Sequence, residues 1–366
     1  MDFNNTSSTI SSSYDYPGEF DPTSTLWQDF IVAMEITFII VGIFGNTLLI
    51  FIIIANNNMH SAHNYLLVCL AIGDLLLLTL GVPIFVFKKI TTYASFLHKS
   101  SIGCKLVHGC LVMAECVSIG TFTALSVDRY MVIRYRMTSC NSQSYRKYIC
   151  ICICIWFLAI CISAPIFHQA YITELPLYGN MSLITCYPFV MHSNFAKTYQ
   201  VTVAIIMYMI PLVLILICYS KMAFILMTSI RTNNVISQGS ATDAMTRRRY
   251  LARSVLIMIV IFAICWLPLH ASEIVRQYND EDINFTVRQH PLMQLISNIK
   301  YLMIIFSACA NPLVLFTVSK QFKRYLRQYF CCKKSIDLKH PKSFTLVPSY
   351  KKVGQIEKDT TRSTSL

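Results

Sequence analysis

The residues most able to do chemistry in this chain are ionisable side chains that fall inside long apolar segments. Asp74, Glu115 and the pair Asp128-Arg129 are each flanked by runs of aliphatic and aromatic residues. Such residues are costly in hydrocarbon unless they are paired, bind an ion or a ligand, or take part in a conformational change. The sequence offers no nucleophile beside a base, no metal-binding cluster and no phosphate-binding loop, so we expect no enzymatic activity.

The composition indicates which elements must position these side chains. The chain has 366 residues, of which 55% are hydrophobic and 13% charged, whereas soluble domains carry about 25% charged residues. The apolar residues form seven blocks of about 20 residues or more, long enough to cross roughly 30 Å of hydrocarbon as helices. We therefore predict an all-α membrane protein, a seven-transmembrane helix bundle, with spans near 30–55, 64–88, 104–134, 148–167, 198–228, 250–275 and 292–317.

We divide the chain into four segments. A disordered extracellular N-terminus is predicted over residues 1–29, and the seven-helix domain over 30–318. Residues 1–29 lack the basic start and early apolar run of a signal peptide, so we expect the first block to be an anchor. A short amphipathic eighth helix is predicted over 319–332, and a disordered cytoplasmic tail over 333–366. Cys331 and Cys332 end the amphipathic stretch and are candidates for palmitoylation.

The basic residues predict how the bundle is oriented in the plasma membrane. With the N-terminus outside, all but eight of the 31 Lys and Arg residues lie on the cytoplasmic side, as the positive-inside rule requires. Most of the net charge of +13 then lies on the cytoplasmic face, where it would contact anionic lipid and an acidic partner. We therefore expect no nucleic-acid binding. Four glycosylation sequons fall in segments that this topology places outside, at Asn4, Asn5, Asn180 and Asn284.

Two of the fifteen cysteines differ from the rest. Most cysteines lie within apolar blocks, where they pack as small hydrophobic residues. Cys104 begins the third block, and Cys186 lies between the fourth and the fifth. Both are on the predicted outer, oxidising side, so we expect them to form a disulfide.

Short motifs in all seven blocks give the chain a family resemblance. Asp128-Arg129-Tyr130 lies about 37 Å along the third helix from Cys104, at the cytoplasmic boundary. The other landmarks are Gly45-Asn46, residues 70–74 (LAIGD), Trp156, Pro211, residues 265–268 (CWLP) and Asn311-Pro312. Together they resemble the rhodopsin class (class A) of G-protein-coupled receptors. Within that class, the chain resembles the bombesin, endothelin and CCHamide group of neuropeptide receptors, through residues 81–83, 102–106, 122–126, 311–316 and 319–323.

The resemblance implies roles for residues along the bundle axis. G-protein coupling and switching would involve Asp128, Arg129, Tyr130, Tyr219, Asn311, Pro312 and Phe316. An activation core that passes movement inward would comprise Ile119, Pro211, Phe262, Trp266 and Pro268. An allosteric sodium ion would bind oxygen atoms of Asp74, Ser118, Ser307 and Asn311. The alternative for Asp74 is a protonated, hydrogen-bonded carboxyl. Because Arg248 stands where some relatives have an acid, we expect Arg129 to pair only with Asp128 at rest.

The outer halves of the helices predict the kind of ligand. Glu115 lies about 16 Å along its helix from Cys104, and other ionisable residues share its end of the bundle. Direct ligand contact and internal pairing, such as Glu35 with Lys300, both remain open. Leu111 occupies the position of the aspartate that binds amines in amine receptors, which argues against a monoamine ligand. Ala308 occupies the position of the lysine that binds retinal in opsins, which argues against retinal. A mixed-charge pocket suits a peptide, and the candidate ligand-binding residues are Glu115, His270, Glu273, Arg276 and Lys300.

We therefore predict a receptor that binds an extracellular neuropeptide and activates a heterotrimeric G protein. Its expected partners after activation are a receptor kinase and arrestin, and residues 363–366 resemble a PDZ-binding C-terminus. Tyr14 and Tyr16, flanked by acids, are candidates for sulfation. The alternative within the class is a chemokine-like or lipid-activated receptor. A transporter or channel would need paired repeats or an acid chain across the membrane, and the sequence shows neither.

Overall fold

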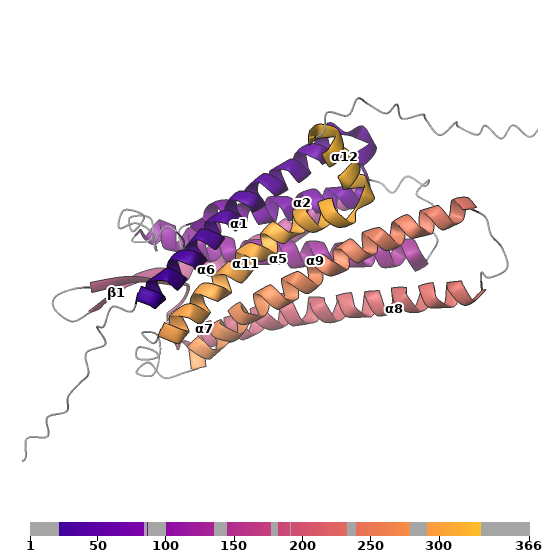
Figure 1. Ribbon diagram of the computed structural model, residues 1–366. Helices are drawn as coiled ribbons and strands as arrows, with labels where there is room; N and C mark the ends of the chain where they lie inside the picture. Colours follow the sequence, from indigo (N-terminus) through magenta and orange to yellow (C-terminus); the bar gives the residue numbers. More distant parts are fainter. Residues whose placement is uncertain are drawn as a thin grey trace, which may run out of the picture. The chain divides into compact units, whose positions relative to one another are not determined.

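The computed structural model describes residues 22–83, 86, 100–134, 145–176, 182–190, 192–232, 239–278 and 291–330. Nearly all of this is helical (Figure 1). The helices are α1 (Pro22–Ala55), α2 (Ala62–Leu76), α5 (Ser101–Arg134), α6 (Tyr145–Gln169), α7 (Asn194–Val203), α8 (Ile210–Thr232), α9 (Gly239–Tyr278), α11 (Pro291–Val318) and α12 (Lys320–Phe330). A short 3-10 turn, η1 (Asn57–Met59), precedes α2, and π-helical turns extend α2 as η2 (Leu77–Gly81) and join α7 to α8 as η3 (Ala204–Met209).

Within the described residues, seven helical segments are long and apolar enough to cross a membrane, which confirms the predicted bundle. They contain between 19 and 34 residues, and about 20 residues suffice for one crossing. The first boundary was predicted too late. Helix α1 begins at Pro22, and its apolar part begins at Leu26. The boundary was missed because the first turn of the helix is polar, and hydropathy alone does not reveal a polar helical turn.

Helix α5 is the packing centre of the bundle, because it contacts α2, α6, α8 and α9. Helix α1 packs against α2 and α11, and α11 packs against α9. Figure 1 shows these helices running alongside one another. These contacts bury the side chains of Glu115, Asp128 and Arg129 on α5, whereas Arg134 at its end is exposed.

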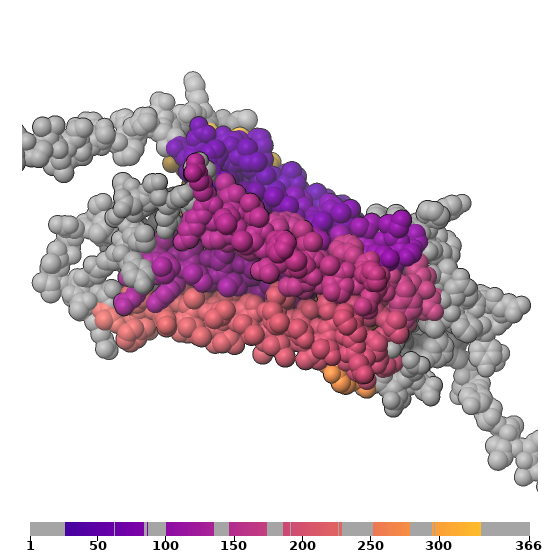
Figure 2. Space-filling model, turned by 180° about the vertical axis from the view of Figure 1, so that it is seen from behind, coloured from indigo at the N-terminus to yellow at the C-terminus, as the bar shows by residue number. Residues whose placement is uncertain are grey.

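The face of the bundle formed by α6 and α8 exposes apolar side chains, as expected for a surface that contacts lipid. On α6 and α8 these include Ile153, Phe157, Leu216 and Phe224. Figure 2 shows this face, on which α6 and α8 are uncovered over most of their lengths. In water such a surface would be an interaction site, whereas in a bilayer it is the normal exterior of a spanning helix.

Small residues bring the helices close at the level of the buried polar groups. A Cβ atom on Gly45 of α1 would lie 2.8 Å from Cγ of Pro312 in α11, and one on Gly73 of α2 would lie 2.8 Å from Cγ1 of Val117 in α5. Glycine is therefore required at both positions for this separation. Gly73 and Val117 directly precede Asp74 and Ser118, so the α2–α5 contact sets the distance between these two polar side chains.

The structure contains one hairpin among the described residues that we did not predict from the sequence. Strand β1 (Tyr171–Pro176) pairs antiparallel with β2 (Ser182–Tyr187), with Ile172 opposite Cys186. The predicted eighth helix is confirmed over Lys320–Phe330. The ring of Phe322 is buried and packs edge-on against Phe316 of α11, with centroids 6.2 Å apart. Cys331, Cys332 and the predicted tail lie outside the described residues.

Candidate functional site

At one end of the bundle a disulfide fastens the hairpin to α5. Cys104 and Cys186 are bonded, as predicted. Both half-cystines are buried with Ile166, Ala170 and Phe189. The bond holds β2 over the end of α5, which places Tyr187 beside the outer part of α9.

Below this hairpin, two of the predicted ligand-binding residues form a buried pair. Nε2 of His270 in α9 lies 2.8 Å from Oε1 of Glu115 in α5. The ring of Tyr208 in η3 packs against His270, with centroids 4.8 Å apart. The Glu115 side chain is 1% exposed and that of His270 is 9% exposed. Three elements therefore meet at this pair.

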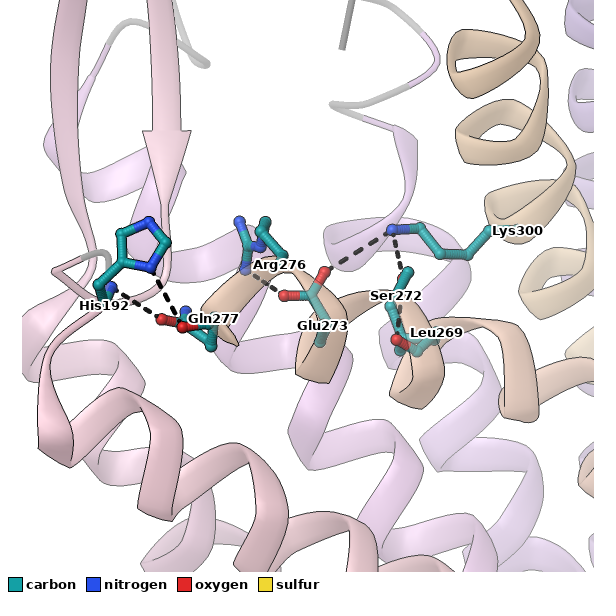
Figure 3. A network of polar contacts seen from close by, with 7 residues as sticks. All are labelled: His192, Leu269, Ser272, Glu273, Arg276, Gln277 and Lys300. Carbon is teal, nitrogen blue, oxygen red and sulfur yellow. Dashed lines mark hydrogen bonds and ion pairs between the residues drawn. The ribbon is translucent and has the colours of Figure 1, made fainter. Parts of the chain in front are cut away.

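The other three predicted ligand-binding residues form a second cluster, closer to the hairpin (Figure 3). Glu273 of α9 forms ion pairs with Arg276 of the same helix and with Lys300 of α11, whose Nζ lies 3.6 Å from Glu273 Oε1. Lys300 also donates a hydrogen bond of 3.0 Å to Ser272. One carboxylate shared by two cations leaves the cluster with a net positive charge.

This mouth cluster, defined as Glu273, Arg276 and Lys300, lies next to the disulfide-bonded hairpin. The guanidinium carbon of Arg276 is 5.9 Å from the ring centroid of Tyr187 in β2. Arg276 Nε is buried and has no hydrogen-bond partner among the described residues. A cation that is stacked on an aromatic ring and has an unused donor is suited to bind a carboxylate or carbonyl oxygen of a ligand.

Three further contacts attach the end of α9 to residues that follow β2. The backbone N–H of His192 donates to Oε1 of Gln277, and Nδ1 of His192 lies 3.1 Å from the Gln277 carbonyl oxygen (Figure 3). His192 has a φ of 57°, a left-handed conformation that few side chains adopt. Lys197 of α7 lies 5.3 Å from the ring centroid of Tyr278.

In the middle of the bundle the predicted activation core forms a stack of rings. Phe262 packs on Trp266 with centroids 5.5 Å apart, and edge-on against Phe122 of α5 at 5.6 Å. Ile119 is buried in the same region of α5, and Pro211 is half-buried at the start of α8. Pro268 lies inside α9, where its missing N–H leaves a backbone carbonyl without its usual donor.

The predicted sodium ligands are all buried, and two of them are in direct contact. Nδ2 of Asn311 in α11 donates a 2.8 Å hydrogen bond to Oδ2 of Asp74 in α2. Ser118 and Ser307 are buried on α5 and α11. Asn46 of α1 donates to the carbonyl oxygen of Ala308, next to Ser307. Four helices therefore contribute polar groups at this level.

At the other end of α5, Arg129 has the partner that we predicted. Its guanidinium lies 2.8 Å from Asp128 Oδ2. The second Asp128 oxygen accepts a 2.5 Å hydrogen bond from the hydroxyl of Tyr148 in α6. Tyr130 is half-buried, with Lys221 Nζ 6.0 Å from its ring centroid. The Asp128 carboxylate therefore binds Arg129 on its own helix and Tyr148 on α6.

The remaining predicted residues occupy separate places. The Tyr219 hydroxyl donates to the carbonyl oxygen of Ala252 in α9, at 2.9 Å, so it bridges α8 and α9. Pro312 and Phe316 are buried on α11. Glu35 is buried on α1, and its pairing with Lys300 stays a prediction. The four sequons, Asn4, Asn5, Asn180 and Asn284, lie outside the described residues.

Sequence reasoning missed several residues that complete these contacts. Tyr148, Tyr208 and Tyr187 are ordinary apolar-segment or loop tyrosines in the sequence, and only packing shows which polar group each one meets. Gln277 gave a weak signal. An amide four residues after Glu273 lies about one helical turn further along α9, which would have placed it at the same end as the mouth cluster.

Comparison with known proteins shows the family. Residues 45–315, about three quarters of the chain, match the model of the 7 transmembrane receptor (rhodopsin family). Bombesin receptor subtype-3 of Ovis aries is 29% identical over 311 residues, covering 83% of this chain and 76% of that protein. A bombesin receptor of Bombina orientalis is 27% identical over 299 residues, covering 80% and 74%. Tachykinin-like peptides receptor 86C of Drosophila melanogaster is 28% identical over 328 residues, covering 87% and 60%.

These relatives agree with the resemblance carried by the short motifs, and the match covers all the clusters described above. The seven spanning helices independently make the chain a multi-pass membrane protein. The chain belongs to the rhodopsin family of seven-transmembrane receptors.

Proposed function

We propose that this chain is a plasma-membrane receptor that binds an extracellular peptide at the disulfide end of the bundle and activates a heterotrimeric G protein at the Arg129 end. The N-terminus would be extracellular. The main support for the proposal is the mouth cluster. It places two cations and one carboxylate next to a disulfide-bonded hairpin, in a chain whose sequence is similar to peptide receptors. The three relatives named above are receptors for bombesin or tachykinin-like peptides.

The charges of this cluster favour a peptide with an anionic or carbonyl-rich end. Arg276 and Lys300 share Glu273, so a ligand carboxylate can bind the cations without leaving a buried charge unpaired. The unused Nε donor of Arg276 points to the same chemistry. Receptor kinase, arrestin and a PDZ-domain protein would bind the cytoplasmic side, in keeping with the Ser- and Thr-containing tail.

Screening a library of secretory peptides against cells that express the full chain tests this function. We expect at least one peptide to mobilise calcium, and Arg276→Ala to lower its potency by about tenfold or more, since a lost charged contact costs at least about 1.4 kcal/mol. Lys197→Ala is the matched control, because Lys197 lies at the same end outside the mouth cluster. Activation by a lipid with no response to any peptide would contradict the proposed ligand class.

We also propose that a sodium ion binds at Asp74 and stabilises the resting receptor. The donor set fits, because Asp74, Asn311, Ser118 and Ser307 are buried oxygen-bearing residues on α2, α5 and α11, and a hard cation prefers such ligands. Asp74 Oδ2 already accepts from Asn311. The other carboxylate oxygen and the two hydroxyls would hold the ion, which supplies only charge neutralisation.

Sodium should therefore raise the thermal stability of the purified receptor relative to choline at equal ionic strength. It should also lower the affinity of the active peptide by about fivefold or more, the lower range of ordinary allosteric coupling. Asp74→Asn should remove both effects, and Thr79→Ala, an exposed change on η2, should keep them. Equal sodium dependence in wild type and Asp74→Asn would remove the proposed ion.

A further inference from the structure

The pair formed by Glu115 and His270 joins α5 to α9, which no other ion pair described above does; Glu273 and Lys300 join α9 to α11. Asp128 and Arg129 are neighbours on α5, and Glu273 and Arg276 are both on α9. Glu115 and His270 instead link α5 to α9, and both side chains are at least nine-tenths buried. Their contact therefore restrains the separation of two helices.

The facing atoms of the pair are also buried. Glu115 Oε1 and His270 Nε2 have no other hydrogen-bond partner among the described residues. The nearest acid on α9, Glu273, is held by Arg276 and Lys300. Separating the pair would leave a buried charge without a partner, which is far more costly than losing an exposed contact. The resting position of α9 is thus favoured by this contact.

Neighbouring contacts connect the pair to the ring stack. His270 follows Trp266 by four residues, or about one helical turn, and Trp266 packs on Phe262. Tyr208 packs on His270 and donates a 2.5 Å hydrogen bond to the carbonyl oxygen of Ala263. The same stretch of α9 is therefore fastened to α5 by the pair and to η3 by Tyr208, directly below the mouth cluster.

We propose that Glu115 and His270 are positioning residues that hold α9 against α5 in the resting receptor, and that ligand binding at the mouth cluster separates them. This inference rests on the proposed function, because the helix movement is read out as G-protein activation. A ligand favours activation only to the extent that it binds the separated arrangement more tightly. Loss of the pair should therefore activate the receptor partly in the absence of ligand.

Basal nucleotide exchange and helix separation test the inference together. Glu115→Gln keeps the side-chain volume, and His270→Phe keeps the ring against Tyr208, but each removes the ion pair. We expect either change to raise ligand-free exchange by about fivefold or more, the lower range of ordinary coupling. The swapped variant, Glu115→His with His270→Glu, should return exchange towards the wild-type level, which a general packing defect would not do.

Helix separation is measured without any G protein. Spin labels attached through azido amino acids at Arg134 of α5 and Arg253 of α9, both exposed, avoid the fifteen cysteines. The single variants should populate a longer distance, and the swapped variant the wild-type distance. Thr37→Ala, which removes a side-chain hydrogen bond to Ala33 within α1, is the control and should change neither measurement.

The outcomes separate this inference from the proposed function. A longer distance without exchange on any G protein would support the positioning role and contradict the proposed function. An unchanged distance in Glu115→Gln would overturn the positioning role whatever the exchange rate. If His270→Phe does not reach the cell surface, Glu115→Gln, which changes no volume, decides the question.

Discussion

Replacing Arg129 by alanine is expected to abolish peptide-stimulated nucleotide exchange while leaving peptide binding largely intact. Arg129 lies 25 residues beyond Cys104 on the same helix, about 37 Å away, so it cannot contact a ligand at the mouth cluster. Its guanidinium is held by Asp128, which is itself held by Tyr148. This arrangement keeps the cation at the end of α5, where a G protein would bind.

The expected loss is large because Arg129 is a buried cation that forms an ion pair with Asp128. Removing one partner of a buried, hydrogen-bonded charge pair costs about 2–5 kcal/mol at an interface, which corresponds to a factor of about 30 or more. Exchange is measured on membranes with purified G protein, and peptide affinity on the same membranes without it. The two readings separate coupling from ligand recognition.

Arg134→Ala provides the matched control for Arg129→Ala. Arg134 is a basic residue at the same end of α5, but it is exposed and is not part of the Asp128–Arg129 ion pair. Its removal should leave exchange close to the wild-type level. If exchange survives in Arg129→Ala, or is lost equally in Arg134→Ala, the assignment of this end of the bundle to the G protein is wrong.

The bundle itself follows from the sequence because hydrocarbon imposes a simple requirement. Every backbone donor and acceptor in a span must be paired internally, so the apolar blocks had to be helices. The disulfide followed for a similar reason, since Cys104 and Cys186 are the cysteines that a seven-span topology places at one end outside the apolar interior. Neither prediction needed knowledge of side-chain packing.

Partner choice in the interior did not follow from the sequence. Glu115 lies in the half of α5 that contains Cys104, but its contact with His270 depends on how α5 and α9 are rotated about their axes. The contacts of Lys300 with Glu273 and Ser272 were likewise not predicted. Rotation is decided by close contacts, such as Gly73 with Val117, and these are invisible to a hydropathy pattern.

The hairpin was missed for a different reason. Residues 171–176 and 182–187 lie between two spans and show no strong alternation of apolar and polar side chains. The local sequence pattern therefore did not predict strands. Their pairing is favoured by the disulfide, which attaches Cys186 to α5 and leaves the backbone of β2 beside β1. The disulfide is a covalent constraint between residues far apart in the sequence, which a local pattern cannot reveal.

Breaking this covalent constraint should cause the largest loss of peptide binding. Cys186→Ala is expected to reduce peptide affinity more than tenfold in the receptors that reach the surface, because the hairpin would no longer be fixed to α5 and its ordering would oppose peptide binding. The bond closes a loop of 82 residues. It also holds Tyr187 against Arg276, so its loss would disturb a residue proposed to bind the ligand. Affinity is measured on intact cells and normalised to surface receptor.

Two further variants show whether the bond, and not the thiols, is responsible. Cys150→Ala removes an exposed free cysteine of α6 and should leave affinity unchanged. The double variant Cys104→Ala with Cys186→Ala should bind as weakly as either single variant, because both changes remove the same interaction. If the double variant instead recovered wild-type affinity, the defect of the single variants would come from an unpaired thiol, and the hairpin would hold Tyr187 in place without the disulfide.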